Sequence, residues 1–535
     1  MNIINANTSL KGLLGLGMMI VLTIPFQSCE LDEDPASSQL AVLPYETLAE
    51  LELGVNGIYG QLIRAAWMTT FYVNGWSGDD MTTHRASNKA DFREYDQRFI
   101  TPDNSRSFTN WGAVYEMIRA ANTVLANSEG VQLSDQAAQN RLIGETYFLR
   151  GLMFFHLTRI HGRIALPLSI VPDPEIGLAT QIEVYEQIEN DLIEAESRLP
   201  VTSNLGATRP NSGSARAILA RLYLDWAGFP VREYTKYNSA IASAKQVIDN
   251  AAAHGFALVE DMGSLYTLAG RFNTESLYTI AYCADCGLSN RKHGKLGLPA
   301  DFGGWQETFA EIRFFEDFPE GPRKDATYHT AVPVDADGNA TSDVANAADF
   351  VPWTEFKDQQ NPVFRKIVGP FEDAIWPGFE SSRNDYYMRY AELLLIYAEA
   401  SGRAGNLTAD AWEALNMVRR RAAGLPPTVP DASVDVTSGD LAELAFAEKK
   451  WELAGEYLRW YDLVRMERVE EALGGDARNP RVSIGTVYDA SGNATPVPLT
   501  EPSNPILGPL GQDNYFAPIP AQEIEKNPNL GNQGN

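Results

Sequence analysis

A chain of 535 residues is long enough to bury a sizeable core, so it needs no disulfide or bound metal to fold. Its composition is 44% hydrophobic, 21% charged and 10% aromatic, which is typical of a globular protein and excludes a disordered chain. The formal net charge of -27 comes with no basic patch, and such a surface repels phosphodiester backbones, so nucleic acid is excluded as a partner. A multispan membrane protein is also excluded, because only the N-terminus carries a long apolar stretch.

Residues 1–28 are predicted to be a lipoprotein signal peptide. Lys11 is the only charged residue before Cys29. It is followed by an apolar run of about a dozen residues, the length of a secretory signal and too short to cross a bilayer. The run ends at Ser28-Cys29, where a small residue precedes a cysteine. We expect cleavage before Cys29 and lipidation of its thiol; the alternative is an ordinary secretory signal with an incidental cysteine.

Residues 29–40 are predicted to form an acidic tether. Four of the five residues from Glu30 to Asp34 are acidic, so this segment cannot pack into a core. The other two cysteines, Cys283 and Cys286, follow a strand-like run at 276–280. In an exported protein we expect either a structural disulfide or two inert thiols. Redox catalysis is not expected, because the neighbouring Asp285 disfavours a reactive thiolate.

Apolar residues at helical spacing predict a mainly α-helical scaffold in two blocks, at about 41–255 and 386–470. Helices joined in pairs by short turns indicate a superhelical stack of tetratricopeptide-like helix pairs, although no repeat of about 34 residues can be counted. The expected helices are 108–125, 136–160, 182–199, 212–227, 234–253, 386–400, 409–422 and 441–468.

Residues 256–385 interrupt the helical pattern. They are rich in Gly, Pro, Asp and aromatic residues, which predicts a loop-rich, partly β irregular region. A C-terminal loop segment, 471–535, completes a single domain over 41–535. The turns at 335–339 and 489–493 carry oxygen side chains as calcium loops do, but neither has a Glu at the twelfth position. Hairpin tips are therefore favoured, and no cofactor is expected, with a structural calcium ion as the alternative.

Five linked motifs occur in order along the chain. They are Trp111-x3-Tyr115-x2-Ile118-x3-Asn122, Glu145-x4-Arg150-Gly151-x2-Phe154-Phe155, Arg389 to Ala400 with Arg419-x-Arg421, Lys449-Lys450-Trp451-Glu452 with Arg459-Trp460-x-Asp462, and Phe516-Ala517-Pro518-Ile519-Pro520. These motifs resemble the SusD/RagB family of outer-membrane nutrient-binding lipoproteins, which usually has Glu and Arg at the positions of Lys449 and Lys450. The resemblance implies a cell-surface protein, lipid-anchored in the outer membrane, that captures an oligosaccharide and delivers it to a SusC-like TonB-dependent transporter barrel.

Candidate ligand-binding residues lie on loops at 76–85 and in the irregular region. A glycan site needs flat aromatic rings to stack on sugar C–H faces and polar side chains to bind hydroxyls. For each tryptophan, local packing is the alternative. Trp111, Trp451 and Trp460 lie at helical spacing and are expected in the core. The candidates are Trp76, Asp79, Asp80, Arg85, Trp305, Trp353 and Trp376.

No catalytic residues are expected. Glu392 and Glu399 lie seven residues apart on one predicted helical face, and paired carboxylates can indicate a glycosidase. We instead expect a buried ion-pair network, because Arg389, Arg419, Arg421, Arg459 and Arg465 offer partners to these carboxylates and to Asp462. The six histidines show no zinc spacing. The alternatives to an oligosaccharide receptor are a peptide or glycopeptide receptor and a surface glycosidase.

Overall fold

The computed structural model describes residues 43–66, 68–373 and 380–531, so the predicted lipidation site Cys29 and the candidate Trp376 lie outside the described residues. Within these ranges the chain is mainly α-helical, with short strands, as predicted. No described helix is both long enough and apolar enough to span a membrane.

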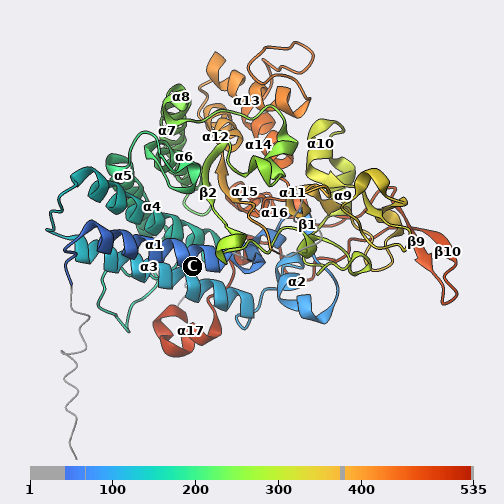
Figure 1. Ribbon diagram of the computed structural model, residues 1–535, viewed down its shortest axis with the longest axis horizontal. Helices are drawn as coiled ribbons and strands as arrows, with labels where there is room; N and C mark the ends of the chain where they lie inside the picture. The colour runs from blue at the N-terminus through green and yellow to red at the C-terminus, as the bar shows by residue number, and fades with distance from the viewer. Residues whose placement is uncertain (1–42, 67, 374–379, 532–535) are drawn as a thin grey trace, which may run out of the picture. The chain divides into compact units, whose positions relative to one another are not determined.

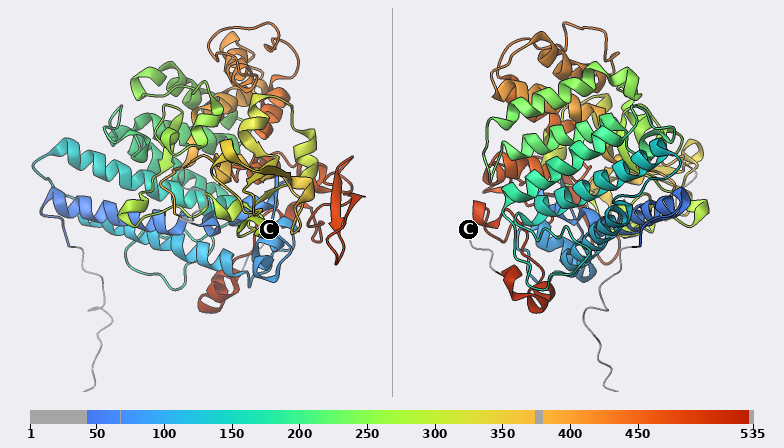
Figure 2. Two further views of the ribbon diagram at one scale, coloured as in Figure 1. Left: turned by 45° about the vertical axis from the view of Figure 1, so that its right-hand side comes forward. Right: turned by 90° about the vertical axis from the view of Figure 1, so that its left-hand side faces the viewer.

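The first helical block stacks its helices in chain order. Each helix contacts the next one in the series, and Figures 1 and 2 show the helices lying side by side. Polar caps begin several of them: the Asn104 side chain accepts the Arg106 and Ser107 N–H groups, and Thr180 forms a capping box with Glu183. The helices are α1 (Leu48–Ala66), α3 (Ser105–Ser128), α4 (Gln136–His161), α5 (Gln181–Arg198), α6 (Ser212–Trp226) and α7 (Lys236–Asp249), with the short α8 (Ala251–His254) after them.

The second helical block packs against the first. Helix α12 (Tyr390–Arg403) contacts α6 and α7 on one side and α13 (Ala409–Ala422) and α14 (Leu441–Glu452) on the other. The two blocks therefore share one apolar core, in which Leu394 and Ile218 are both fully buried. This arrangement confirms the predicted stack of helix pairs.

Two predicted helices in this block are wrong in part. The helix expected at 441–468 ends at Glu452, and the chain turns before α15 (Arg459–Arg465) and α16 (Val469–Leu473). Gly455 and Tyr457 have φ values of 77° and 62° in this turn, which a helix cannot accommodate. The helix expected from Tyr386 begins at Tyr390, because residues 385–389 pair as a strand with 276–280.

The irregular region is built from two-stranded antiparallel sheets and short helices (Figure 1). Its aromatic residues form two further apolar clusters around Trp76 and Trp353. The paired strands are β1 (Met81–Thr82) with β3 (Phe309–Ala310), β2 (Ser276–Ile280) with β8 (Asp385–Arg389), β4 (Tyr328–His329) with β7 (Val363–Phe364), β5 (Ala331–Val334) with β6 (Asp349–Pro352), and β9 (Ile484–Tyr488) with β10 (Ala494–Pro498). The short helices outside the two blocks are α2 (Ala90–Asp96), α9 (Ile312–Asp317), α10 (Pro322–Thr327), α11 (Arg365–Val368) and α17 (Ala521–Lys526).

In both acidic turns, an Asp carboxylate accepts hydrogen bonds from backbone N–H groups of the same turn. Asp335 Oδ1 accepts the N–H groups of Asp337 and Asn339, each at 2.9 Å, directly after β5. Asp489 Oδ1 accepts those of Ser491 and Asn493 at 2.8 and 2.9 Å, at the tip of the β9–β10 hairpin. The carboxylates therefore close turns. In the described part of the chain, no three His, Cys, Asp or Glu side chains are grouped so that they could hold a metal ion.

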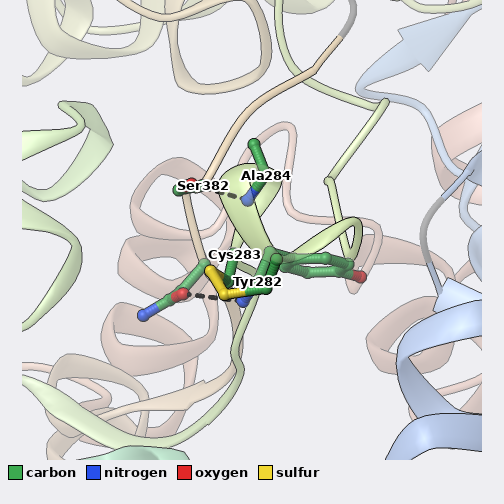
Figure 3. The surroundings of a disulfide bond; sticks show 6 residues. Tyr282, Cys283, Ala284 and Ser382 are labelled. Carbon is green, nitrogen blue, oxygen red and sulfur yellow. Dashed lines mark hydrogen bonds between the residues drawn. A yellow bond between two sulfur atoms is a disulfide. The ribbon is translucent and has the colours of Figure 1, made fainter.

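Cys283 and Cys286 form a disulfide, which decides between the two predicted states of this pair. Figure 3 shows the bond with Tyr282 and Ala284 next to it and Ser382 of a distant segment beside Ala284. Ala284 N donates to Ser382 Oγ at 2.9 Å, and Tyr282 N donates to Asn384 Oδ1 at 3.2 Å. The disulfide thus closes a turn that is fastened to the segment leading into β8.

Candidate functional site

Trp305 is the one exposed tryptophan among those the structure describes, with 47% of its surface accessible. It lies on a loop that folds back on itself, because Gly304 N donates to Pro299 O at 2.9 Å and Gln306 N donates to Leu298 O at 3.0 Å. A Cβ atom on Gly304 would lie 2.0 Å from Leu298 O, so only glycine fits there. These backbone contacts fix the loop that carries Trp305 at the surface.

A network of polar side chains centred on Asp358 is connected to the loop that carries Trp305. His84 Nδ1 accepts the Ala86 N–H at 2.9 Å, so its Nε2 carries the proton and donates to Asp358 Oδ1 at 3.0 Å. Gln306 Nε2 donates to the other carboxylate oxygen of Asp358. Asp301 accepts the Lys357 and Asp358 N–H groups. We call the set His84, Asp301, Trp305, Gln306 and Asp358 the Trp305 platform.

Arg85 follows His84 directly and is exposed, and its Nε donates to Ser503 O at 2.6 Å. The His84–Asp358 contact therefore links the segment that carries Arg85 to the irregular region that carries Trp305.

Trp76 and Trp353 lie inside the protein. Trp76 is 0% exposed, its indole N–H donates to Glu307 O at 3.1 Å, and its ring contacts Phe92 with a centroid distance of 4.5 Å. The expectation of ligand stacking at Trp76 is therefore corrected to a packing role, because no ring face reaches solvent. Trp353 is 7% exposed and belongs to the apolar cluster that contains Phe302, in the loop before Trp305.

Asp79 and Asp80 are also buried, and they join distant parts of the chain. Asp79 Oδ1 accepts Arg459 Nε at 2.7 Å. Burial alone would raise the pKa of Asp79, but Arg459 and Lys450 outweigh it and lower this pKa. Asp80 Oδ2 accepts the Gly455 N–H at 2.9 Å, and burial raises the pKa of Asp80 to about 6. These contacts replace the predicted ligand role of both carboxylates with a structural one.

The other members of the Trp305 platform were not among the predicted ligand-binding residues. His84 and Asp301 were visible beside the candidates Arg85 and Trp305. The Gly303-Gly304 pair also signalled a tightly folded loop. Nothing in the sequence marked Asp358, which lies 274 residues from His84 along the chain.

The carboxylates of the family motifs form the predicted buried ion-pair network. Glu399 is 0% exposed and accepts two hydrogen bonds from Arg465, at 2.8 and 2.6 Å. Although burial would raise the pKa of Glu399, Arg465 and Arg403 outweigh it and lower this pKa. A glycosidase acid needs a raised pKa and access to substrate, and Glu399 has neither.

Some partners in the network differ from those expected. Glu392 pairs with Arg221 of α6, whose Nε lies 2.8 Å from Glu392 Oε1. Lys449, at the position where the family usually has Glu, donates to Asp462 Oδ1 at 2.9 Å. Arg421 bridges Glu275 and Glu452, each at 2.7 Å. The network therefore ties the helices of the second block to α6 and to Glu275, the residue before β2.

Two parts of this chain match known protein families. Residues 339–535 match the SusD family, and residues 31–224 match a family described as starch-binding associating with outer membrane. The chain belongs to the SusD/RagB family. SusD-like protein P2 of Formosa agariphila is 27% identical over 543 residues, which cover 96% of this chain and 97% of that protein.

Solved structures of SusD-like proteins share this fold. A SusD homolog from Bacteroides thetaiotaomicron has a TM-score of 0.72 at 20% identity and covers 90% of this chain and 96% of its own. A laminarin binding SusD-like protein has a TM-score of 0.69 at 24% identity, with coverage of 90% and 98%. A structure with xylogluco-oligosaccharide has a TM-score of 0.70 at 21% identity, with coverage of 89% and 97%.

Proposed function

We propose that this SusD/RagB-family protein is a non-catalytic receptor that binds an oligosaccharide at the Trp305 platform. The exposed Trp305 ring on its fixed loop carries this proposal. A sugar stacked on the ring can hydrogen-bond to the carboxylates of Asp301 and Asp358 and to the Gln306 amide. Each aromatic contact contributes about 1 kcal/mol, so we expect an affinity in the micromolar to millimolar range.

The similarity to a laminarin binding protein and to a structure with xylogluco-oligosaccharide supports a carbohydrate ligand. The ion-paired burial of Glu392 and Glu399 supports binding without hydrolysis. A glycan array probed with the intact protein tests both points. Binding to glycans without product release supports the proposal, whereas binding to peptides alone, or release of product that Glu392→Gln abolishes, contradicts it.

We further propose that Cys29 is lipidated, that this anchor holds the protein on the cell-surface side of the outer membrane, and that the protein hands its ligand to a SusC-like TonB-dependent barrel. The family described as associating with the outer membrane supports this placement. Two acyl chains on one cysteine anchor a protein stably, whereas a single chain does so only marginally.

Three measurements test this location. We expect radiolabelled palmitate to be incorporated by the wild type and not by Cys29→Ala. External proteinase should digest the protein on intact cells, and a barrel protein should co-purify after mild detergent extraction. Unlabelled wild-type protein, protection from proteinase or a reproducibly solitary protein would each count against the proposal.

A further inference from the structure

The segment 353–360 contacts both the loop that carries Trp305 and the β9–β10 hairpin. On the loop, the ring of Phe302 meets the ring of Phe356 edge-to-face, with the two centroids 5.1 Å apart. Asp358 also accepts hydrogen bonds from a backbone N–H group and a side chain of this loop. The segment is therefore fixed against the Trp305 loop by an aromatic contact and by polar contacts.

The β9–β10 hairpin is fastened to the same segment. Gln360 Oε1 accepts the Thr486 N–H at 3.2 Å, and Gln360 Nε2 donates back to Thr486 O. The Tyr488 hydroxyl donates to Glu355 O at 3.2 Å. Figures 1 and 2 show this hairpin at the outer edge of the irregular region. The hairpin therefore holds Tyr488 against a segment that also belongs to the surroundings of Trp305.

Tyr488 is a partly exposed aromatic residue whose ring is not explained by core packing. Unlike Trp353, it packs into none of the apolar clusters of the residues that the structure describes. The Lys357 ammonium lies over its ring, with Nζ 5.6 Å from the centroid. The same lysine donates its backbone N–H to Asp301 Oδ2 at 2.5 Å. Lys357 therefore contacts the Tyr488 ring with its side chain and the Trp305 loop with its backbone.

Two adjacent, exposed residues connect the surroundings of the two rings. Lys357 contacts Tyr488, whereas Asp358 accepts a hydrogen bond from Gln306, the residue after Trp305. An ammonium group donates to sugar hydroxyls and a carboxylate accepts from them. The stretch from Trp305 to Tyr488 therefore offers two aromatic rings with a donor and an acceptor between them.

We propose that Tyr488 binds a further sugar unit of the same ligand, so that the Trp305 platform recognises an extended oligosaccharide rather than a single sugar or a disaccharide. This inference rests on the function proposed above for the platform. Sugar units that reach both rings would stack on each, and Lys357 and Asp358 would bind the hydroxyls between them. Because one chain makes both contacts, the second contact forms at a high effective concentration and raises the affinity.

Calorimetric titration against oligosaccharides of increasing length tests the inference. The probes are size-fractionated laminari-oligosaccharides and xylogluco-oligosaccharides, together with a size series of any glycan that the array identifies. We expect the wild-type affinity to rise by about fivefold or more from the shortest to the longest members, and we expect Tyr488→Ala to abolish this rise. Trp305→Ala should weaken binding at every length. Thermal unfolding checks that each variant is folded.

Two further variants separate the ring of Tyr488 from its other roles. Tyr488→Phe keeps the ring and loses only the hydrogen bond to Glu355, so it should keep the rise with length to within about twofold. Tyr234→Ala is the matched control, because Tyr234 is 64% exposed and lies before α7 in the first helical block. It should titrate as the wild type does. A rise that survives in Tyr488→Ala, or that Tyr488→Phe also abolishes, would overturn the inference.

The inference and the proposed function fail in different ways. If Trp305→Ala weakens binding at every length but the wild-type affinity does not rise with length, the platform stands and the role of Tyr488 is refuted. If Trp305→Ala binds every series as the wild type does, or if the wild type binds no series, the proposed platform is wrong and the role of Tyr488 is refuted with it.

Discussion

The helical blocks and the irregular region are held together by different kinds of contact. In the blocks, neighbouring helices such as α4 and α5 bury apolar side chains that recur at helical spacing. In the irregular region, polar pairs join residues far apart in sequence, such as His84 with Asp358, 274 residues apart. The blocks therefore provide a rigid support, whereas the region that displays Trp305 depends on individual polar contacts.

The largest expected effect comes from breaking the charge network where the two regions meet. Arg421→Met leaves Glu275 and Glu452 buried with one cation fewer, so we expect the free energy of unfolding to fall by about 3–5 kcal/mol. Chemical denaturation measures this loss of unfolding free energy. Arg198→Met is the control: Arg198 and Glu194 are 34% and 45% exposed, and the loss should be about 0–1 kcal/mol. If Arg421→Met and Arg198→Met lost the same unfolding free energy, the buried ion pairs would contribute no more to stability than an exposed pair.

The pH dependence of stability tests the contact between Asp80 and the turn after α14. Burial raises the pKa of Asp80 to about 6, above its ordinary value, so the folded state binds this proton more tightly than the unfolded state. The stabilisation is complete below about pH 4 and is lost as the pH rises through about 6, by up to about 3 kcal/mol. Asp80→Asn should remove this slope in unfolding measured between pH 4 and 7.5. If stability depended on pH in the same way in the wild type and in Asp80→Asn, the raised pKa assigned to Asp80 would be contradicted.

Removal of the disulfide should have a smaller effect, because its loop is short. The double variant Cys283→Ser/Cys286→Ser is expected to lose about 2 kcal/mol or less of unfolding free energy. Denaturation without reductant measures this loss, and reduced wild-type protein serves as the matched reference. A loss above about 4 kcal/mol would mean that the bond organises the region rather than closing one turn.

The smallest energetic effect is expected at the Trp305 platform, where function should change without loss of stability. Trp305→Ala is expected to weaken glycan binding about tenfold, equivalent to about 1.4 kcal/mol, because one stacking surface is lost. Calorimetric titration measures the affinity, and the unfolding free energy should change by about 0.5 kcal/mol or less.

Phe350→Ala provides the control, since Phe350 is 49% exposed and lies outside the platform. It should leave glycan affinity unchanged. If both variants bind as the wild type does, the platform is not the ligand site.

Sequence reasoning predicted the helical blocks well, because their signal is local. Helix α13 coincides with the predicted 409–422, and α4 differs from its prediction by one residue. The prediction failed where a distant partner decides the conformation. Residues 385–389 pair with β2, and the turn after Glu452 places the Gly455 N–H against Asp80, 375 residues away along the chain.

The candidate site was predictable only in part for the same reason. Trp76 and Trp305 both stand beside glycine and acidic residues, yet one is fully buried and the other is 47% exposed. The difference depends on Phe92 and Tyr457, which cover Trp76 in the folded chain. Composition around a tryptophan therefore identifies a loop, but it does not identify which ring faces solvent.

The contact between Asp79 and Arg459 also bears on how the polypeptide matures. Synthesis proceeds from the amino end, so the carboxylate is made long before the guanidinium that neutralises it. The early segment can therefore reach its final state only when almost the whole chain exists. A prematurely terminated product retains an uncompensated charge at a position meant for the interior, which keeps it partly open and marks it for proteolysis.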